Sequence, residues 1–339
     1  MTLPLVQVLP PGPGGVADFA CCLVAHWQAA GRPSVLLPLA EPDAADRLAA
    51  ALPDGGTLVV HFSGYGYAPR GLCDWLVDAV QALRARPGVP LRVVTVFHEL
   101  YAVGPPWRSA FWTSAAQQRI AIRLAASSDA LWTNTQAHAR WLAQHAPARP
   151  LLVRPVFSNI GEPAEPPAFA ARERTAVVFG SAVTRQRAFD ALARCPRALR
   201  ALPLESLTEI GPGAPSTIAP GLPPRQVLGA LPPAALRDTL QRAAFGVLDY
   251  PGPLLGKSGV FAALVACGCV AINTDRACAP GDGLTAGLEY LALDGAADDA
   301  PDIAARALAW YAGHRAARQA QELLDLCGLA APRTLEATA

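Results

Sequence analysis

Apolar strand-like segments alternate with helical segments along most of the chain, and this alternation constrains the fold more than any other feature. The first segment, residues 3–9, shows no amphipathic alternation, as expected for a parallel strand that is covered on both faces. Further strands are expected at 35–39, 57–62, 91–97, 130–134 and 151–156, with helices at 16–30, 42–52, 71–85, 109–126 and 136–145 between them. Such repeats predict a parallel, doubly wound sheet, because right-handed crossovers place helices on both faces.

The same pattern restarts after a Pro-rich stretch at residues 158–174. Strands are expected at 175–179, 204–210, 226–228, 245–248 and 270–273, and helices at 186–199, 233–243, 259–266 and 302–326. The 339 residues are 52% hydrophobic, which is enough to fill two cores. We therefore predict an α/β protein with two doubly wound, Rossmann-like domains at 1–157 and 175–326, a linker at 158–174 and a tail at 327–339.

Net charge and cysteine content indicate which kinds of partner and which cellular compartment to expect. The formal net charge is +1, so the overall field demands neither a nucleic acid nor an anionic membrane, and we expect no nucleic-acid partner. The eight cysteines include no C-x-x-C pair, lie mostly in apolar runs and follow no secretory leader. This pattern predicts a cytoplasmic protein without disulfides and without a metal site.

A single lysine stands in front of a segment that is predicted to be a buried helix. Lys257 follows a Gly-rich loop, and Ser258 and Gly259 lead into residues 260–266, which are apolar on every side. A helix N-terminus behind such a loop is an anion site, because its N–H groups and its dipole point at whatever lies in front. Every other strongly basic side chain is an arginine, so a compact ammonium retained here favours a phosphate site.

Two alternatives for this segment stay open. The loop could simply be the Gly- and Ser-containing entry to a buried helix. It could also be a P-loop, since residues 252–258 match G-x-x-x-x-G-K-[ST] with one residue missing. Against the P-loop, Pro253 lacks one of the N–H groups that would wrap the phosphates.

Polar and aromatic side chains follow two expected strands of the first half. His61, Tyr65 and Tyr67 come at the end of the third strand, and His98 and Glu99 directly after the fourth. Ligands of doubly wound sheets collect at such strand ends. Imidazole and carboxylate groups bond hydroxyls and aromatic faces cover sugar C–H surfaces, so these residues predict a pocket for a hydroxyl-rich molecule. A hydrogen-bonded structural histidine is the alternative for His61.

A Gly-rich turn at residues 10–15 follows the first strand. Its spacing is not that of a dinucleotide fingerprint, but Gly15 lets another molecule approach the backbone closely. Asp18, in the helical turn that follows, is either a catalytic acid or an acid favoured there by the helix dipole.

A second glycine turn, at Gly180 and Ser181, opens the second half. Arg185 and Arg187 lie just past this turn, on the strand-end side that is also expected for Lys257, so the three cations could converge on one diphosphate. A solvated arginine is the alternative.

Residues 105–112, with Trp107 and Trp112, form an aromatic surface-loop candidate. This segment could dock an acceptor or touch a lipid bilayer at the periphery of a membrane. A helix staple that fills the core is the alternative.

Taken in order, these pieces resemble the GT-B glycosyltransferases, specifically the group 1, family 4-like branch. The resemblance covers residues 3 to about 326. Its segments are Gly14-Gly15-Val16-Ala17-Asp18-Phe19, His61 to Tyr67, Val94 to Tyr101, Phe157-Ser158-Asn159-Ile160, Val178-Phe179-Gly180-Ser181 and Lys257 to Cys269.

The resemblance implies a metal-independent enzyme without a cofactor, which transfers a sugar from a nucleotide-diphosphate donor, UDP or GDP, to a hydroxyl acceptor across the cleft between the domains. The acceptor would be a glycan, a lipid or a small molecule, as in polysaccharide biosynthesis. By this likeness Gly15, Gly180, Ser181, Arg185, Tyr250, Lys257, Ser258 and Gly259 bind the donor, His61, Tyr65 and Tyr67 bind the acceptor, and His98, Glu99 and Asp18 serve catalysis.

The sequence departs from that branch at two positions. Such enzymes usually carry two glutamates around the phosphate helix, and alignment on Cys267-Gly268 places Leu255 and Ala263 there. Retention of the anomeric configuration therefore does not follow from the resemblance. A P-loop NTPase or kinase, a non-catalytic nucleotide-sugar-binding subunit, and an epimerase or hydrolase of the same architecture stay open as alternatives.

Overall fold

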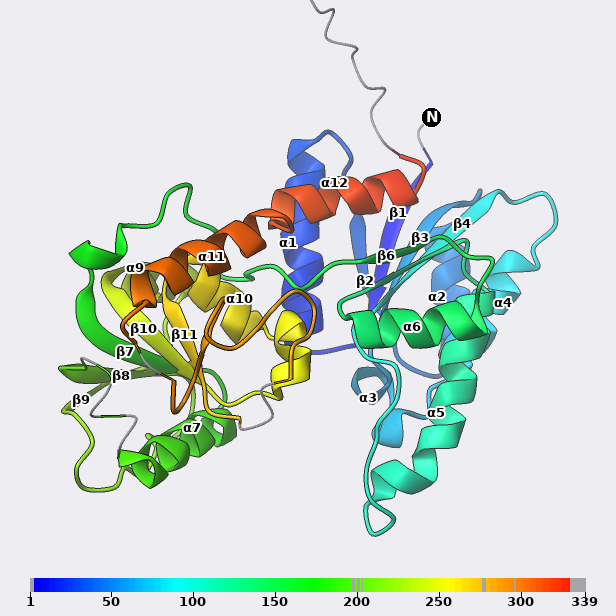
Figure 1. Ribbon diagram of the computed structural model, residues 1–339. Helices are drawn as coiled ribbons and strands as arrows, with labels where there is room; N and C mark the ends of the chain where they lie inside the picture. The colour runs from blue at the N-terminus through cyan, green and yellow to red at the C-terminus, as the bar shows by residue number, and fades with distance from the viewer. Residues whose placement is uncertain are drawn as a thin grey trace, which may run out of the picture. The chain divides into compact units, whose positions relative to one another are not determined.

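The computed structural model describes residues 3–196, 199, 202, 204–275, 279–295 and 297–329 (Figure 1). The chain divides into two compact units, each built on one six-stranded sheet. The first unit contains the residues up to Arg154 together with those from Ala316 onward, and the second runs from Pro155 to Arg315. Within the described part of the chain, no helix is both long enough and apolar enough to cross a bilayer.

The first unit is a parallel sheet with strand order β2-β1-β3-β4-β5-β6. Its strands are β1 Leu5–Leu9, β2 Val35–Pro38, β3 Gly56–Phe62, β4 Leu91–Phe97, β5 Ala130–Thr133 and β6 Leu151–Val153. Its helices are α1 Gly15–Ala29, α2 Ala44–Ala51, α3 Gly64–Tyr67, the 3₁₀-helix η1 Pro69–Gly71, α4 Asp74–Arg84, α5 Ser109–Ala126, α6 Gln136–His145 and α12 Ala316–Leu326. The chain passes from β1 to β2 and then returns to the other side of β1, so the strand order reverses between β1 and β3.

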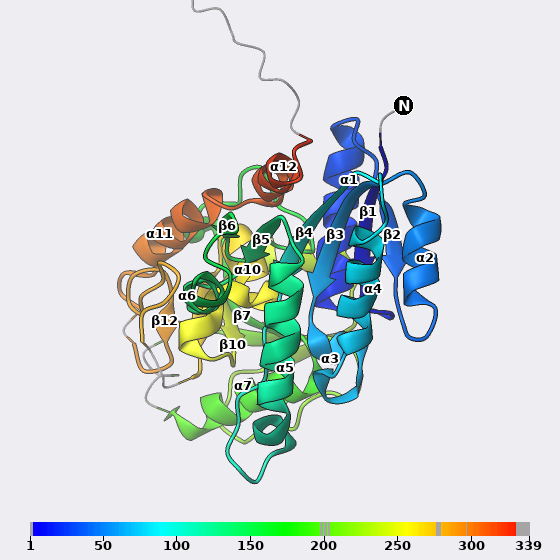
Figure 2. The same cartoon turned by 90° about the vertical axis from the view of Figure 1, so that its right-hand side faces the viewer.

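Different helices cover the two faces of this sheet. Helices α2, α4, α5 and α6 share a core with alternate strand residues such as Val6 and Val60, and Figure 2 shows α4 and α5 in front of this face. Helix α1 covers the opposite face (Figures 1 and 2). Because side chains alternate along a strand, Gln7 and His61 lie on the α1 face, one position from Val6 and Val60.

The C-terminal helix of the described chain belongs to the first unit. The sequence predicts one helix at 302–326 within the second domain, whereas the structure has α11 Ala300–Ala312 and α12 Ala316–Leu326, separated at residues 313–315. Helix α12 packs beside α1, where the indole Nε1 of Trp27 donates to the carbonyl oxygen of Ala320 at 2.8 Å (Figure 1). A continuous helical periodicity across residue 313 concealed this change of unit.

The second unit repeats the plan with strand order β12-β11-β10-β7-β8-β9, again all parallel. Its strands are β7 Glu173–Phe179, β8 Ser206–Ile210, β9 Arg225–Gly229, β10 Ala243–Leu248, β11 Val270–Asn273 and β12 Leu291–Ala292. Its helices are η2 Phe169–Ala171, α7 Ala182–Arg194, α9 Pro233–Arg242, η3 Gly252–Lys257, α10 Gly259–Ala266 and α11, with η2 and η3 being 3₁₀-helices. The order reverses between β7 and β10. The prediction of two doubly wound parallel sheets is confirmed.

Candidate functional site

A cavity of about 240 Å³ opens where the strand order of the second sheet reverses. Its wall is built from the carboxyl ends of β7 and β10 and from the start of α10. The lining residues are Val178, Phe179, Gly180, Ser181, Thr184, Val247, Leu248, Asp249, Tyr250, Lys257, Ser258, Gly259 and Val260. Six of the residues that the sequence predicted to bind the donor are therefore brought to one cavity, namely Gly180, Ser181, Tyr250, Lys257, Ser258 and Gly259.

Two helices begin at this cavity, and each has a serine as its N-terminal cap. The hydroxyl of Ser181 accepts from the N–H of Thr184 at 3.3 Å in α7. The hydroxyl of Ser258 accepts from the N–H of Phe261 at 3.2 Å in α10. The other N–H groups of each first turn have no partner within their helix, and the positive ends of both dipoles lie at the wall. With the half-buried Lys257 directly before α10, the cavity suits an anion.

The turn after β7 requires glycine. Gly180 has a φ of +127°, and a Cβ there would lie 3.2 Å from the Oγ1 of Thr184. At Gly259, by contrast, a Cβ would meet nothing within 4 Å, so the backbone at the start of α10 is open to a ligand. Sequence reasoning therefore identified both glycines, although for different physical reasons.

Among the lining residues, Asp249 is the one acid and Lys257 the one base. Sequence reasoning missed Asp249, whose place between strand β10 and Tyr250 was the available signal. Its Oδ1 accepts from the hydroxyl of Thr274 at 2.9 Å, and its carboxylate forms an ion pair with Arg187. These contacts hold the carboxylate at the side of the cavity.

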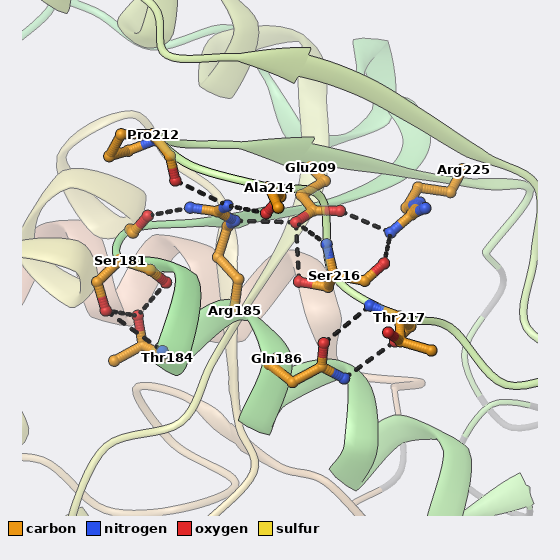
Figure 3. A network of polar contacts seen from close by, with 11 residues as sticks. Ser181, Thr184, Arg185, Gln186, Glu209, Pro212, Ala214, Ser216, Thr217 and Arg225 are labelled. Atoms are coloured by element: carbon orange, nitrogen blue, oxygen red, sulfur yellow. Dashed lines mark hydrogen bonds and ion pairs between the residues drawn. The ribbon is translucent and has the colours of Figure 1, made fainter.

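Arg185 is not part of the cavity, contrary to the predicted contact with a diphosphate. Its side chain is 1% exposed and forms an ion pair with Glu209 at 2.9 Å (Figure 3). Its remaining donors bond the carbonyl oxygens of Gly180 at 2.6 Å, Pro212 at 3.1 Å and Ala214 at 3.2 Å. The guanidinium thus holds the turn at Gly180 by its hydrogen bond to the carbonyl oxygen there, and its charge is neutralised by the buried Glu209.

Glu209 is the centre of this network (Figure 3). One carboxylate oxygen accepts from the backbone N–H and from the hydroxyl of Ser216, both at 2.8 Å, and the other pairs with Arg225 at 2.7 Å. Burial opposes ionisation of this carboxyl, but the hydrogen bonds from Arg185 and Ser216 and the charge of Arg225 outweigh it and lower the pKa. The loop after β8 is therefore tied to the start of α7 by an ionised group.

The segment before Lys257 does not form a phosphate-wrapping loop. Residues 252–257 fold as the 3₁₀-helix η3, in which the N–H groups of Leu254 and Ser258 donate to the carbonyl oxygens of Pro251 and Leu255. The N–H of Gly252 donates to the carboxylate of Asp275 at 2.9 Å. Loop N–H groups that a P-loop would present to phosphates are thus used within the protein, which disfavours that alternative.

The first unit carries a buried imidazole pair at the carboxyl edge of its sheet. The Nδ1 of His61 lies 3.1 Å from the Nε2 of His98, and the Nε2 of His61 lies 2.9 Å from the Oε1 of Gln7. The amide nitrogen of Gln7 donates to the hydroxyl of Ser34 at 2.8 Å. Burial, and secondarily the charge that His98 can carry, hold the pKa of His61 well below its ordinary value of 6.5. His61 is therefore a neutral ring at physiological pH.

Sequence reasoning did not identify Gln7, although a signal was present. Gln7 is the one polar residue in the strand Leu5–Leu9, all of which is buried. A buried amide requires hydrogen-bond partners, so a glutamine in such a strand indicates a polar contact across the sheet. The order of the strands, which sequence did not provide, decides that the partner is His61.

The other predicted residues of the first unit are placed differently. Tyr67 is buried and its hydroxyl donates to the carbonyl oxygen of His61 at 3.0 Å, whereas Tyr65 is 49% exposed. Asp18 is exposed in the first turn of α1, and Glu99 is exposed directly after His98. Gly15 is the first residue of α1, and a Cβ there would meet nothing within 4 Å.

No protein-family model matches the sequence, and no curated protein matches it. Solved structures do match. An alpha-glucosyltransferase in complex with UDP and a 13-mer DNA superposes with a TM-score of 0.59 at 11% identity, over 97% of this chain and 100% of the other. An alpha,alpha-trehalose-phosphate synthase (UDP-forming) from Burkholderia xenovorans gives a TM-score of 0.50 at 14% identity, over 83% of this chain and 75% of the other. The structure of TarM gives a TM-score of 0.52 at 9% identity, over 84% of this chain and 57% of the other.

The fold is GT-B. The two doubly wound sheets of this chain correspond to the two Rossmann-like domains of that architecture, as the resemblance in the sequence implied. At such low identity the GT-B likeness identifies the fold alone.

One prediction about partners was wrong. The near-zero net charge led us to expect no nucleic acid, but several solved structures with this GT-B fold are complexes of an alpha-glucosyltransferase with DNA. Net charge reports the mean field of a whole chain and says little about one face of one unit, so it is a poor ground for that exclusion.

Proposed function

We propose that this protein is a glycosyltransferase that moves a sugar from a nucleoside diphosphate to a hydroxyl-bearing acceptor. The observation that carries the proposal is the cavity of the second unit, where Lys257 and the N-termini of α7 and α10 meet at a topological switch point. The proposed occupant of the cavity is the diphosphate of the donor. The GT-B fold supports the same activity, because the similar solved proteins are named as glycosyltransferases or sugar-phosphate synthases.

The chemistry of the transfer requires a site of this kind. When a glycosyl–phosphate bond breaks, negative charge grows on the diphosphate and positive charge grows on the sugar. A fixed ammonium and helix N–H groups stabilise the leaving group at the place where its charge develops. One such contact contributes on the order of 2 to 4 kcal/mol to the transition state. Because protein groups supply this charge, we propose that transfer needs neither a metal ion nor a cofactor.

The stereochemical course is left open by this proposal. Leu255 and Ala263, which stand where glutamates are usual, are 1% and 0% exposed. Neither position could present a side chain to a ligand without disturbing the core. Asp249 is the carboxylate at the cavity instead, and we propose that it faces the donor.

For the donor we favour UDP over GDP, because the alpha-glucosyltransferase and the trehalose-phosphate synthase are described with UDP. For the acceptor, the proposal requires a hydroxyl group and leaves glycan, lipid, small molecule and DNA as classes to be tried. We further propose a cytoplasmic location, since the described cysteines are all unpaired thiols, as in a reducing compartment.

The test is a thermal-shift panel of the purified chain with UDP, GDP, UDP-glucose and ATP, each with magnesium or with EDTA. Stabilisation by UDP or UDP-glucose in EDTA is the expected result, because a ligand that binds only the folded state raises Tm. Release of UDP from UDP-glucose, followed with the four acceptor classes, then tests transfer. A shift that needs ATP together with magnesium would instead favour an NTPase.

A further inference from the structure

Exposed apolar side chains gather where the chain enters helix α5. Trp107, just before the helix, and Trp112, near its start, are 82% and 74% exposed. Val103 and Phe111 are exposed as well. We call residues 103–112 the aromatic loop. Its tryptophans fill no core, so the alternative of a core-filling helix staple is wrong. Single exposed apolar side chains are ordinary on a protein surface, but four within ten residues mark an interaction surface.

Hydrogen bonds within the aromatic loop fix its shape. The indole Nε1 of Trp112 donates to the carbonyl oxygen of Pro106 at 2.8 Å. The N–H of Arg108 donates to the carbonyl oxygen of Pro105 at 2.9 Å, and the N–H of Phe111 donates to that of Arg108 at 3.1 Å. The two prolines have no N–H group at all. Because these donors are satisfied or missing, taking the loop out of water leaves fewer polar groups without partners.

The base of the aromatic loop is anchored in the first unit. The N–H of Ala102 donates to the Oε1 of the buried Gln117 at 2.6 Å, and the Nε2 of Gln117 donates to the carbonyl oxygen of Arg70 at 2.7 Å. Figures 1 and 2 both show the segment between β4 and α5 projecting beyond α3. The apolar side chains are therefore carried on an anchored protrusion of this unit.

The charge around the aromatic loop is positive. Residues 100–128 include three arginines and no acidic residue. Arg108 within the loop and Arg119 on α5 are both exposed. The third, Arg123, pairs with Asp74 at 3.2 Å and with Asp78 at 2.5 Å, both on α4. The loop thus combines apolar rings with cations, a combination that is complementary to an anionic surface with an apolar interior.

An anionic bilayer fits these features better than a nucleic acid or a second copy of the chain. Indole rings are favoured at the boundary between headgroups and acyl chains, because they are apolar over most of their surface. Binding to nucleic acid depends on neutralising several phosphates, whereas the aromatic loop contains one arginine. A stable dimer buries about 20–30 residues on each side, which is more than residues 103–112 offer.

We propose that the aromatic loop docks the first unit on an anionic lipid bilayer. The rings of Trp107, Phe111 and Trp112 lie at the level of the headgroups, and Arg108 and Arg119 face lipid phosphates. A contact made by so few side chains is weak, so docking is reversible and sensitive to salt. The proposal is independent of the transferase function, because neither a nucleotide nor a sugar takes part in it.

The first experiment is co-sedimentation of the full chain with two kinds of vesicle, one of phosphatidylcholine and one of equal parts phosphatidylcholine and phosphatidylglycerol. We expect stronger binding to the mixed vesicles, and this binding should weaken as salt is added. Trp107→Ser should lower the affinity for mixed vesicles at least about fivefold, because the inserted ring is lost. Arg108→Gln should lower it about fivefold on mixed vesicles and leave binding to phosphatidylcholine unchanged.

Two matched controls change similar side chains elsewhere. Val35→Ser removes an exposed apolar side chain on the edge strand β2, and Arg174→Gln removes an exposed cation of the second unit. Both should bind mixed vesicles within about twofold of the wild type, because neither residue belongs to the docking surface.

The second experiment tests whether Trp107 itself enters the bilayer. Bromine atoms on lipid acyl chains quench the fluorescence of nearby indoles. Trp107→Phe keeps an apolar ring, so it should bind vesicles as the wild type does, but its bound form should be quenched less than that of the wild type. Trp27 and Trp132, which are buried in the first unit, supply emission that the lipid does not reach.

The outcomes decide between the occupants of this surface. Absence of wild-type binding to mixed vesicles at low salt would overturn the proposal, and so would equal binding by the wild type and Trp107→Ser. Sedimentation equilibrium and a titration with duplex DNA test the other occupants. A wild-type dimer that Trp107→Ser dissociates, or DNA binding that this variant loses while vesicles are not bound, would also overturn it. A chain that docks as expected but transfers no sugar to any acceptor class would contradict the proposed function and leave the docking surface established.

Discussion

The two sheets reverse their strand order in the same way, yet the polar groups at the two reversals are of opposite kinds. At the first, between β1 and β3, the contacts join an amide, two imidazoles and a hydroxyl, and the buried His61 is neutral. At the second, between β7 and β10, Lys257 and Asp249 line the cavity, and the ionised Glu209 holds Arg185 beside the turn at Gly180. One topology thus supports a neutral hydrogen-bonding site and an ionic site. The side chains on the strands and in the loops that follow them, and not the strand order, decide which of the two arises.

The largest expected effect concerns the ionic network of the second unit. Glu209→Gln leaves the guanidinium of Arg185 buried without its counter-charge, and we expect a loss of about 3–5 kcal/mol in the free energy of unfolding. The matched change in the first unit is Glu322→Gln, which removes a more exposed pair with Arg154 and should cost about 1 kcal/mol or less. Urea unfolding of both variants makes the measurement. Equal losses would show that the two units do not differ in their dependence on buried charge.

The next effect concerns the anion site itself. Lys257→Ala should leave a folded protein whose donor turnover falls at least about a hundredfold, because the leaving diphosphate loses its one fixed ammonium. Arg174→Ala is the control, since it removes an exposed cation near the start of β7, at the opposite edge of the same sheet. Turnover near the wild-type value in Lys257→Ala would contradict the assignment of this cavity to the donor.

A change of pH should separate the two units. The pKa of His61 is lowered below 6.5 in the folded protein, so near that pH the unfolded chain binds a proton at His61 and the folded chain does not. The first unit therefore loses stability as pH falls through 6.5. The pKa of Glu209 is lowered below 4.5, so its contribution to the second unit persists until pH falls below 4.5. Hydrogen exchange of peptides from β3 and β8, compared at about pH 7 and pH 5 and corrected for intrinsic rates, measures the difference.

In the same hydrogen-exchange measurement, His61→Asn should make the stability of the first unit less dependent on pH. The pH dependence of the stability of the second unit should not change. Simultaneous weakening of both units between these pH values would show that the imidazole pair is not the acid-sensitive element.

The smallest expected effect concerns Arg187, whose side chain is 58% exposed in its ion pair with Asp249. Arg187→Ala should change the free energy of unfolding by less than about 1 kcal/mol, because water screens such a pair. Titration of UDP by calorimetry should show an affinity within about threefold of the wild type. A much larger loss would mean that two cations, and not Lys257 alone, hold the diphosphate.

The parts of the molecule that sequence predicted are those that local pattern determines. Helix α10 begins at Gly259 as predicted, because a serine cap followed by eight apolar or small residues is typical of the start of a buried helix. The expected strands of both halves form, because period and length are local properties.

The parts that sequence could not supply depend on which strands become neighbours. Gln7 on β1 contacts His61 on the paired strand β3, and Arg185 at the start of α7 contacts Glu209 on β8, which pairs with the strand before that helix. A basic residue after a strand can turn toward a ligand or into the fold, and Arg185 turns inward because β8 places a glutamate beside it. A helix's own pattern also does not reveal which unit it joins, as α12 illustrates.

The return of α12 to the first unit has a consequence for synthesis on the ribosome. The second unit is a single uninterrupted stretch, complete once Arg315 has emerged, whereas the first lacks a helix until Ala316–Leu326 has been made. Until then Trp27, which is 0% exposed in the finished protein, has no Ala320 carbonyl to bond. The half of the chain that is translated first is therefore the half that finishes folding last, and a fragment that ends at residue 154 would be an incomplete domain.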